Sequence, residues 1–343
     1  MRSNNRKDIR VANRTTDYRP QLATLVKESP LGDEWLHEVK YDGYRIGARV
    51  RHGRVTLYSR NGKDWTAAFP TVVAGVTSLG VRDALLDGEV AMVLPDGCTS
   101  FQALQNVLSS GSSGTVLAYF VFDLVRLEGD RLGPLPLEER KARLLKLVGR
   151  RKTGTVRYSD HVIGHGGEFF THACRAGLEG IISKRRDQPY HPGRHRDWLK
   201  TKCVLRQEFV IGGFTDPEGS RQGIGALLVG YYDDDRLTFA GKVGTGFTHK
   251  AALDLRRRLE ALEVKAGRFT PPPAGALARR AHWVKPALVC EIAFTEWTGD
   301  GKIRHPSFQG VRGDKSPKQV VRERPVARRR SIHGRARGPH GRG

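Results

Sequence analysis

The sequence has few cysteines, and none of them are spaced for metal binding. Its four cysteines, Cys98, Cys174, Cys203 and Cys290, lie far apart and form no CxxC motif. This spacing favours neither a zinc module nor a disulfide framework. We therefore expect a protein of a reducing compartment.

Long apolar runs are also lacking. No segment approaches 18 consecutive apolar residues, and the first residues do not contain the apolar stretch of a signal peptide. No long amphipathic basic helix suited to a membrane surface is present either. We expect a cytoplasmic, nucleoid-associated protein that acts as a monomer without a membrane partner.

Acidic residues are far outnumbered by basic ones. The chain has 59 Lys and Arg against 36 Asp and Glu, which gives a formal net charge of +23. Such an excess opposes compaction, because like charges repel. It favours binding to a polyanion, since each neutralised phosphate releases condensed counterions. The charge predicts a nucleic-acid partner, and the alternative is a basic surface that binds nothing.

The length of 343 residues predicts two domains, because one hydrophobic core seldom grows this large. We expect a basic flexible leader over 1–19, a first domain over 20–203, a second over 204–316 and a basic disordered tail over 317–343. The tail is rich in Arg and poor in apolar residues, so it cannot offset its chain entropy by burial. It is either a nonspecific DNA tether or an inert extension.

The first domain alternates short β-rich runs with helical patterns. Runs at 35–50, 54–60 and 116–125 are rich in β-branched and aromatic residues, and 137–148 has apolar residues at helical spacing. Mixed strands and helices in this order predict an α+β domain.

The second domain has a different pattern. Short strand-like runs at 208–215, 226–233, 236–243 and 287–298 are separated by Gly- and Asp-rich turns, and 251–262 is the one clear helix. About five strands with one helix predict a small β-barrel of the five-stranded OB-fold type.

The strongest local signal is the run EVKYDGYR, which begins at Glu38. If it forms a strand that enters a turn, alternation places Glu38, Lys40 and Asp42 on one face. Burying three ionisable side chains together costs free energy. Their presence on one face therefore favours a functional site. A lysine beside carboxylates, arginines and a metal can act as a nucleophile in its neutral form. The alternative is a solvent-facing strand with salt bridges.

An ordered set of motifs follows this run. In chain order they are SRNG (59–62), LDGE (86–89), FDL (122–124), EGII (179–182), PGRHRDWLKTK (192–202), RHP (304–306) and RGDK (312–315). In order and spacing they resemble the motifs of the covalent nucleotidyltransferases, which include ATP-dependent DNA ligases and mRNA capping enzymes. The details are most similar to the ligase module of bacterial end-joining DNA ligases, over residues 20–316. The resemblance implies an adenylation domain followed by an OB-fold.

The resemblance also implies residue roles. Lys40 would attack the α-phosphate of ATP and hold AMP. Phe122 would stack on the adenine, and its alternative is a plain core residue. The other implied nucleotide contacts are Glu38, Arg45, Arg60, Glu89, Arg194, Lys200 and Lys202. Arginine suits this task because its planar fork matches phosphate oxygens.

A divalent cation is implied as well. Glu179 and Asp42 would coordinate Mg²⁺, or Mn²⁺ in its place, through carboxylate oxygens. Lys200 and Lys202 would both face the α-phosphate, because two neighbouring cations are unfavourable without an anion between them. We also expect this pair to lower the pKa of Lys40 by repulsion between like charges.

The second domain would supply an adenylation motif. The resemblance implies that Arg304, Arg312, Asp314 and Lys315 swing onto the nucleotide while Lys40 is adenylated. The alternative for 312–315 is a charged C-terminal turn.

These inferences predict an ATP-dependent ligase that seals nicks or ends in duplex DNA, in a repair route such as double-strand-break joining. The expected partners are DNA, the Ku end-binding protein and separate polymerase or nuclease proteins. An RNA ligase or RNA-capping guanylyltransferase is the nearest alternative. A catalytically inactive DNA-binding adaptor is a further one.

Overall fold

A computed structural model describes most of the chain. The described residues are 18–110, 116–150, 153–219 and 222–326. The expected leader, except for its last residues, and most of the expected tail lie outside these ranges.

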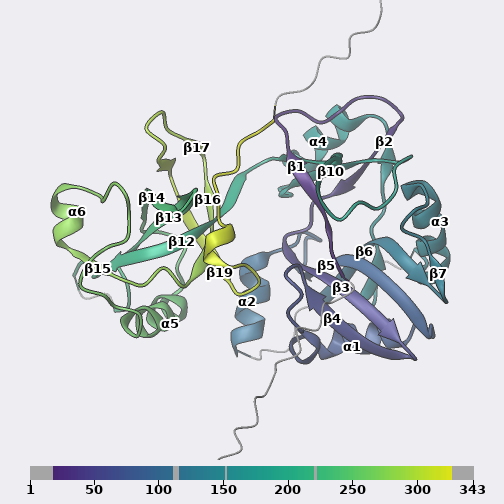
Figure 1. The fold of residues 1–343 in the computed structure, drawn as a ribbon, viewed down its shortest axis with the longest axis horizontal. Coiled ribbons are helices and arrows are strands. Elements are labelled where there is room, and N and C mark those ends of the chain that lie inside the picture. Colours follow the sequence, from purple (N-terminus) through teal and green to yellow (C-terminus); the bar gives the residue numbers. More distant parts are fainter. Residues whose placement is uncertain (1–17, 111–115, 151–152, 220–221, 327–343) are drawn as a thin grey trace, which may run out of the picture.

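Two sheets form the first part of the chain, to the right in Figure 1. The first has the order β1 (Gln21–Leu25), β11 (Gly193–Lys202), β10 (Gly180–Arg185), β2 (Trp35–Val39) and β9 (Val162–Ile163). The β1–β11 pair is parallel and the other pairs are antiparallel. Long-range pairing of this kind brings residues near 40, 180 and 200 into one sheet.

The second sheet is antiparallel along its main path. Its order is β4 (Arg54–Ser59), β3 (Gly43–Arg51), β5 (Asp83–Val93), β6 (Val116–Leu127) and β7 (Asp130–Arg131), and β8 (Val156–Tyr158) pairs in parallel with β6. The helices that pack on it are α1 (Pro70–Thr77), α2 (Phe101–Ser110) and α3 (Leu137–Val148). A short 3₁₀ turn, η1 (Thr66–Ala68), precedes α1. Apolar residues of these elements form one buried core.

Strand register decides which side chains of the first sheet share a face. Glu38 pairs with Ile182, which in turn pairs with Lys200, so all three lie in one row across β2, β10 and β11. Paired residues point to the same side of a sheet. The neighbouring residues His37 and Ser183 point the other way and are buried, on the face where α4 (Gly166–Arg175) packs.

The second domain is an open sheet with short helices beside it, to the left in Figure 1. Its order is β14 (Arg236–Val243), β13 (Ala226–Asp233), β12 (Leu205–Thr215), β16 (Val289–Phe294) and β19 (Ser307–Arg312), and β15 (Ala281–Trp283) pairs with β12. The remaining elements are β17 (Glu296–Trp297), β18 (Ile303–Arg304), α5 (His249–Glu260) and α6 (Gly275–Arg279). Within the described ranges no ladder closes the sheet, although Phe308 N donates to Thr245 O at 2.9 Å where its two edges approach.

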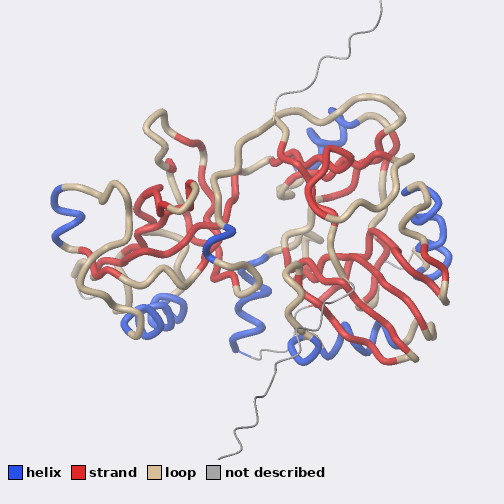
Figure 2. Tube along the Cα trace, in the orientation of Figure 1, coloured by secondary structure: helices blue, strands red, loops and turns tan. Residues whose placement is uncertain are grey.

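The local sequence patterns match these elements closely. The helix predicted over 137–148 is confirmed residue for residue, and the runs at 226–233 and 236–243 are confirmed as strands. Figure 2 shows the helices placed around the outside of the sheets. None of the described helices is long and apolar enough to cross a lipid bilayer.

One expectation about cysteine is wrong. Cys174 and Cys203 form a disulfide, and their Cα atoms lie 5.2 Å apart. The two residues are 29 positions apart in sequence, at the end of α4 and just after β11. Only the packing of α4 beside β10 brings them together, so their spacing carried no signal.

The expected tail is also partly wrong. Residues 317–326 are held on the protein, beginning with a 3₁₀ turn, η2 (Pro317–Gln319), and the fully buried Val320. At the other end, Tyr18 was expected in the flexible leader, yet it is buried and donates to Asp87 at 2.8 Å. Both segments gain fixed positions by contacting residues distant in sequence, which local composition does not report.

Candidate active site

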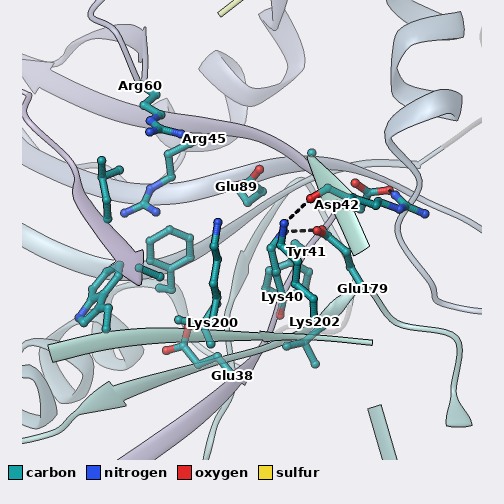
Figure 3. A pocket seen from close by; sticks show the side chains of 18 of the residues that line it. Glu38, Lys40, Tyr41, Asp42, Arg45, Arg60, Glu89, Glu179, Lys200 and Lys202 are labelled. Atoms are coloured by element: carbon teal, nitrogen blue, oxygen red, sulfur yellow. Dashed lines mark hydrogen bonds and ion pairs between the residues drawn. The ribbon is translucent and has the colours of Figure 1, made fainter. Parts of the chain in front are cut away.

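A buried pocket lies between the two sheets of the first domain, and the second domain covers one side of it. Its lining includes most of the residues that sequence analysis selected, which are Glu38, Lys40, Asp42, Arg45, Arg60, Glu89, Phe122, Glu179, Arg194, Lys200, Lys202, Arg312 and Asp314. Figure 3 shows Lys40 and Lys200 pointing into it, with Arg45 and Arg60 across from them. Charged groups from seven strands or strand ends therefore converge on one cavity.

Lys40 follows the last residue of β2. Its backbone N–H donates to Gly180 O at 3.0 Å, and its ammonium group contacts the Glu179 carboxylate. Burial lowers the pKa of Lys40, but the carboxylates of Glu179, Asp42 and Glu89 together outweigh burial, and the pKa is raised overall. Lys40 and Lys200 do repel each other, as expected of two like charges, but this repulsion does not decide the pKa of Lys40, whose net shift is upward. The nearest partner of Lys40 is the Glu179 carboxylate. Lys200 and Lys202 both contact the carboxylate of Glu323.

Two glycines beside Lys40 permit the close approach of strands. A Cβ atom on Gly43 would lie 2.1 Å from Val90 O, and one on Gly180 would lie 2.1 Å from Thr201 O. Gly180 also has a φ of +148°, which favours glycine. The glycines of the DG and EG motifs are thus required by the backbone contacts that hold Lys40 and Glu179 together.

Glu179 and Asp42 are the carboxylates proposed for a metal. Burial raises the pKa of Glu179, but Lys40 and Lys202 outweigh it and lower the pKa. Asp42 accepts from Phe101 N at 3.0 Å and pairs with Arg206. In the described parts of the chain no three metal-ligating side chains cluster. Mg²⁺ commonly takes one or two carboxylates plus substrate phosphates. Glu179 and Asp42 therefore fit an ion whose other ligands come from a bound nucleotide.

Glu38 is buried and already bonded. It accepts from Lys141 Nζ at 2.5 Å, from Lys184 Nζ at 2.8 Å and from Ser159 Oγ at 3.2 Å. Burial raises the pKa of Glu38, but the two lysines outweigh it and lower the pKa. Glu38 lines the pocket, yet its carboxylate is oriented by partners that sequence analysis missed. Lys141 lies in the charged run of α3, where nothing in the pattern distinguishes it from exposed residues such as Glu139 and Arg143.

Arg45 is fixed by a buried carboxylate. Its Nε and Nη2 donate to Asp87 at 2.6 and 2.7 Å, and Asp87 also accepts from the hydroxyls of Tyr18 and Tyr190. The guanidinium lies 4.4 Å from the centroid of the Phe122 ring, which is 7% exposed. Arg45 therefore presents its remaining surface to the pocket in a preset orientation, with the aromatic ring beside it.

Three other predicted contacts line the pocket. Glu89 has a pKa raised to about 8, because burial outweighs the attraction of Arg45 and Lys40. Arg194 donates to the backbone oxygen of Ala23. Arg60 lies across the cavity from the lysines in Figure 3.

The lysine pair on β11 holds an unexpected anion. Lys200 Nζ and Lys202 Nζ donate to the two oxygens of Glu323 at 2.7 and 3.2 Å. Burial and the charge of Lys202 lower the pKa of Lys200 to about 8, although Glu323 opposes the shift. Sequence analysis placed Glu323 in a disordered tail and so missed it.

The second-domain motif reaches the pocket only in part. Arg312 donates to Glu291 at 2.9 Å and to both oxygens of Asp314, and Lys315 pairs with Glu208 at 3.2 Å. These residues lie at or beside the cavity. Arg312 and Asp314 line the cavity, and Lys315 follows them in the turn after β19.

Arg304 differs from the other three motif residues. It pairs with Glu296 at 2.6 Å across the β17–β18 hairpin, and its side chain is 58% exposed. It does not line the pocket. The hairpin projects away from the sheet that carries Arg312, so proximity in sequence did not become proximity in space.

Gln105 was not selected, and it joins the two domains. Its side-chain amide donates to Val311 O, and its Oε1 accepts from Val311 N at 2.9 Å. The amide thus pairs with β19 as a neighbouring strand would, one residue before Arg312. Gln105 lies on α2, and a single glutamine in this stretch carries no sequence signal for such a contact.

Comparisons with known proteins show the family of this chain. Residues 12–202 match the family model described as ATP dependent DNA ligase domain, and residues 220–315 match the ATP dependent DNA ligase C terminal region. The chain is 42% identical over 310 residues to the multifunctional non-homologous end joining protein LigD of Pseudomonas aeruginosa, covering 90% of this chain and 37% of that protein. It is 37% identical over 307 residues to the LigD protein of Mycobacterium tuberculosis, and the match covers 89% of this chain and 40% of that protein.

A solved structure shows the same fold. The mycobacterial DNA ligase D complexed with ATP and MES aligns with a TM-score of 0.66 and 34% identity, covering 89% of this chain and 98% of that one. The chain spans only about two-fifths of the length of the LigD relatives it matches.

Proposed function

The chain belongs to the ATP-dependent DNA ligase family, and we propose that it seals 5′-phosphate/3′-hydroxyl breaks in duplex DNA through a covalent AMP on Lys40. One observation carries this proposal. Lys40 shares a buried pocket with a carboxylate, a lysine pair and an arginine–aspartate pair of the second domain. These are groups that a phosphoryl displacement needs around its nucleophile.

In the first proposed step the neutral amine of Lys40 attacks the α-phosphorus of ATP. A P–N bond forms, the bond to the pyrophosphate oxygen breaks, and the amine proton leaves to solvent or a nearby base. Lys200 and Lys202 would balance charge on the α-phosphate, while Arg312 would orient the departing pyrophosphate. Asp314 and Lys315 would hold that arginine and its turn in place.

Nucleotide recognition would use the preset groups of the pocket. Phe122 would stack on the adenine, and Glu38 would contact its edge. Arg45, Arg60 and Arg194 would bind phosphate or ribose oxygens, and Glu89 the ribose. Glu179 and Asp42 would hold Mg²⁺ or Mn²⁺, which when bound neutralises charge on the phosphoryl oxygens.

Two further displacements complete the reaction. AMP passes from Lys40 to the DNA 5′-phosphate, and a P–O bond forms as the P–N bond breaks. The 3′-hydroxyl then attacks that 5′-phosphate and releases AMP. The net charge of +23 supports the proposal of a duplex DNA substrate.

Labelled nucleotides test the proposal directly. Protein incubated with Mg²⁺ and either labelled ATP or labelled GTP should retain label covalently from ATP and not from GTP. The loaded protein should then seal a nicked DNA duplex. Preference for GTP would favour a capping enzyme, and sealing of nicked RNA but not DNA would favour an RNA ligase.

We further propose a role in double-strand-break end joining, because the relatives carry that name. The partners would be Ku and separate polymerase or nuclease proteins, in the cytoplasm at the nucleoid, with the ligase acting as a monomer. Ligation of nicked, cohesive and blunt DNA with and without Ku tests this role. Stimulation of blunt-end joining by Ku supports it, and no response at any end contradicts it.

Replacing Gln105 by alanine should slow adenylation of Lys40 about thirtyfold, because two hydrogen bonds to Val311 of about 1 kcal/mol each are lost. Single-turnover label transfer from ATP measures this rate. Sealing of a nick that already carries AMP should change much less. Gln188→Ala, away from the domain interface, serves as the control. An equal loss in both assays would mean that Gln105 does not act through domain closure.

A further inference from the structure

The segment after η2 crosses from the second domain to the first. On the second domain, Tyr232 N donates to Val320 O at 2.7 Å, and Gln207 Nε2 donates to Val321 O at 3.1 Å. On the first, Val326 N donates to Leu25 O of β1 at 3.0 Å. Figure 1 shows this yellow segment running from η2 up to β1. We call residues 320–326 the strap.

Glu323 lies in the middle of the strap and points into the pocket. Its carboxylate accepts from Lys200 Nζ at 2.7 Å and from Lys202 Nζ at 3.2 Å. Its backbone N–H donates to Gln207 Oε1 at 2.9 Å, which fixes the residue from the second-domain side. The lysine side chains are 13% and 7% exposed, so the three charges meet largely out of water.

Composition makes this contact notable. Glu323 is the only acidic residue C-terminal to Asp314, in a stretch that is otherwise strongly basic. A carboxylate accepts hydrogen bonds from ammonium groups as a phosphate oxygen does. The one anion of this stretch is therefore bound by the two cations that the proposed reaction needs for the α-phosphate.

We propose that Glu323 is an internal stand-in for the nucleotide phosphate, which ATP must displace from Lys200 and Lys202 when it binds. This inference rests on the proposed function, because that function assigns the lysine pair to the phosphate. Two anions cannot share the pair without repulsion, so the phosphate and the carboxylate compete. The strap thus sets the affinity of the pocket for its nucleotide.

The geometry supports competition over assistance. The Glu323 carboxylate bridges both lysines and lines the same cavity as Lys40 and Glu179. The lysine pair lowers the pKa of Glu323 well below its usual value despite burial, so this competitor stays charged at neutral pH. When the phosphate displaces it, the strap loses its contact with β11 and keeps its backbone bonds to the second domain.

A glutamine in place of Glu323 tests the inference, because it keeps the shape and removes the charge. Binding of ATP with Mg²⁺ is measured by calorimetry in the full chain carrying Lys40→Ala, so that no covalent step intervenes. Glu323→Gln should tighten the dissociation constant about tenfold, because the apparent affinity rises with the fraction of free lysine pairs. Glu260→Gln on α5, which changes net charge equally, should not alter it.

A second variant shows whether the effect passes through the lysine pair. In a chain that also carries Lys200→Gln and Lys202→Gln, Glu323→Gln should no longer tighten binding. Unchanged or weaker ATP binding by Glu323→Gln with the lysines intact overturns the inference, and so does tightening that persists without them.

The two proposals fail in different ways. If the unmodified chain forms no adenylate on Lys40, the proposed function fails. If it forms the adenylate and Glu323→Gln does not tighten ATP binding, only the role of Glu323 fails.

Discussion

Replacing Lys40 by arginine should abolish covalent adenylation, with a loss of at least about 10³-fold in rate, since removing an enzyme's nucleophile removes most of its catalysis. Arginine keeps the positive charge beside Glu179 but stays protonated, so it has no free electron pair for the α-phosphorus. Mass spectrometry of protein treated with ATP and Mg²⁺ should show the adduct at position 40 of the unmodified chain and at no position of the variant.

Two controls separate chemistry from folding. Lys146→Arg, at an exposed position of α3, should adenylate normally. The Lys40→Arg protein should still seal a nick whose 5′-phosphate already carries AMP, because that step does not use the lysine as a nucleophile. An adduct of undiminished yield in Lys40→Arg would show that another residue carries the AMP.

Replacing Asp123 by alanine should destabilise the first domain by about 3–5 kcal/mol, because it leaves a buried guanidinium without its counter-ion. Asp123 and Arg140 are both fully buried, and Arg140 donates to both carboxylate oxygens at 2.7 and 2.8 Å. Arg140 also donates to Leu135 O at 2.6 Å, so it cannot easily turn toward water. Urea unfolding followed by far-UV circular dichroism measures the loss.

The matched control is Asp130→Ala, which removes an exposed carboxylate 3.6 Å from Arg143 and should change stability little. Replacing both buried partners, by Asp123→Leu with Arg140→Met, should recover part of the loss, because no charge then stays buried alone. If the urea midpoint of Asp123→Ala lies within error of that of the control, the Asp123–Arg140 pair contributes nothing to stability.

Much of the local structure and the pocket lining follows from sequence patterns. Apolar spacing of 3.6 residues predicted α3 at its observed bounds, and β-rich runs predicted β4, β13 and β14. Motif order selected thirteen residues that line one pocket, although they come from opposite ends of the chain. Backbone periodicity and short motifs are properties of neighbouring residues, so they can be read without the fold.

Partnerships between distant charges required the tertiary structure. Lys141 holds Glu38 across 103 positions, and Glu323 holds Lys200 across 123. Both partners lie in strongly charged stretches where composition predicts solvent exposure. Their positions depend on how α3 packs on the second sheet and where the strap crosses between the domains.

The sequence alone determined the chemistry available to this protein: a lysine among acids and cations, on strands and helices whose places are set by local spacing. The tertiary structure decided which of those charges meet. It paired Cys174 with Cys203, kept Arg304 out of the pocket and gave Lys40 an acid that raises its pKa. The physical reason is that burial and Coulomb attraction act over a few ångströms in space, whatever the separation along the chain.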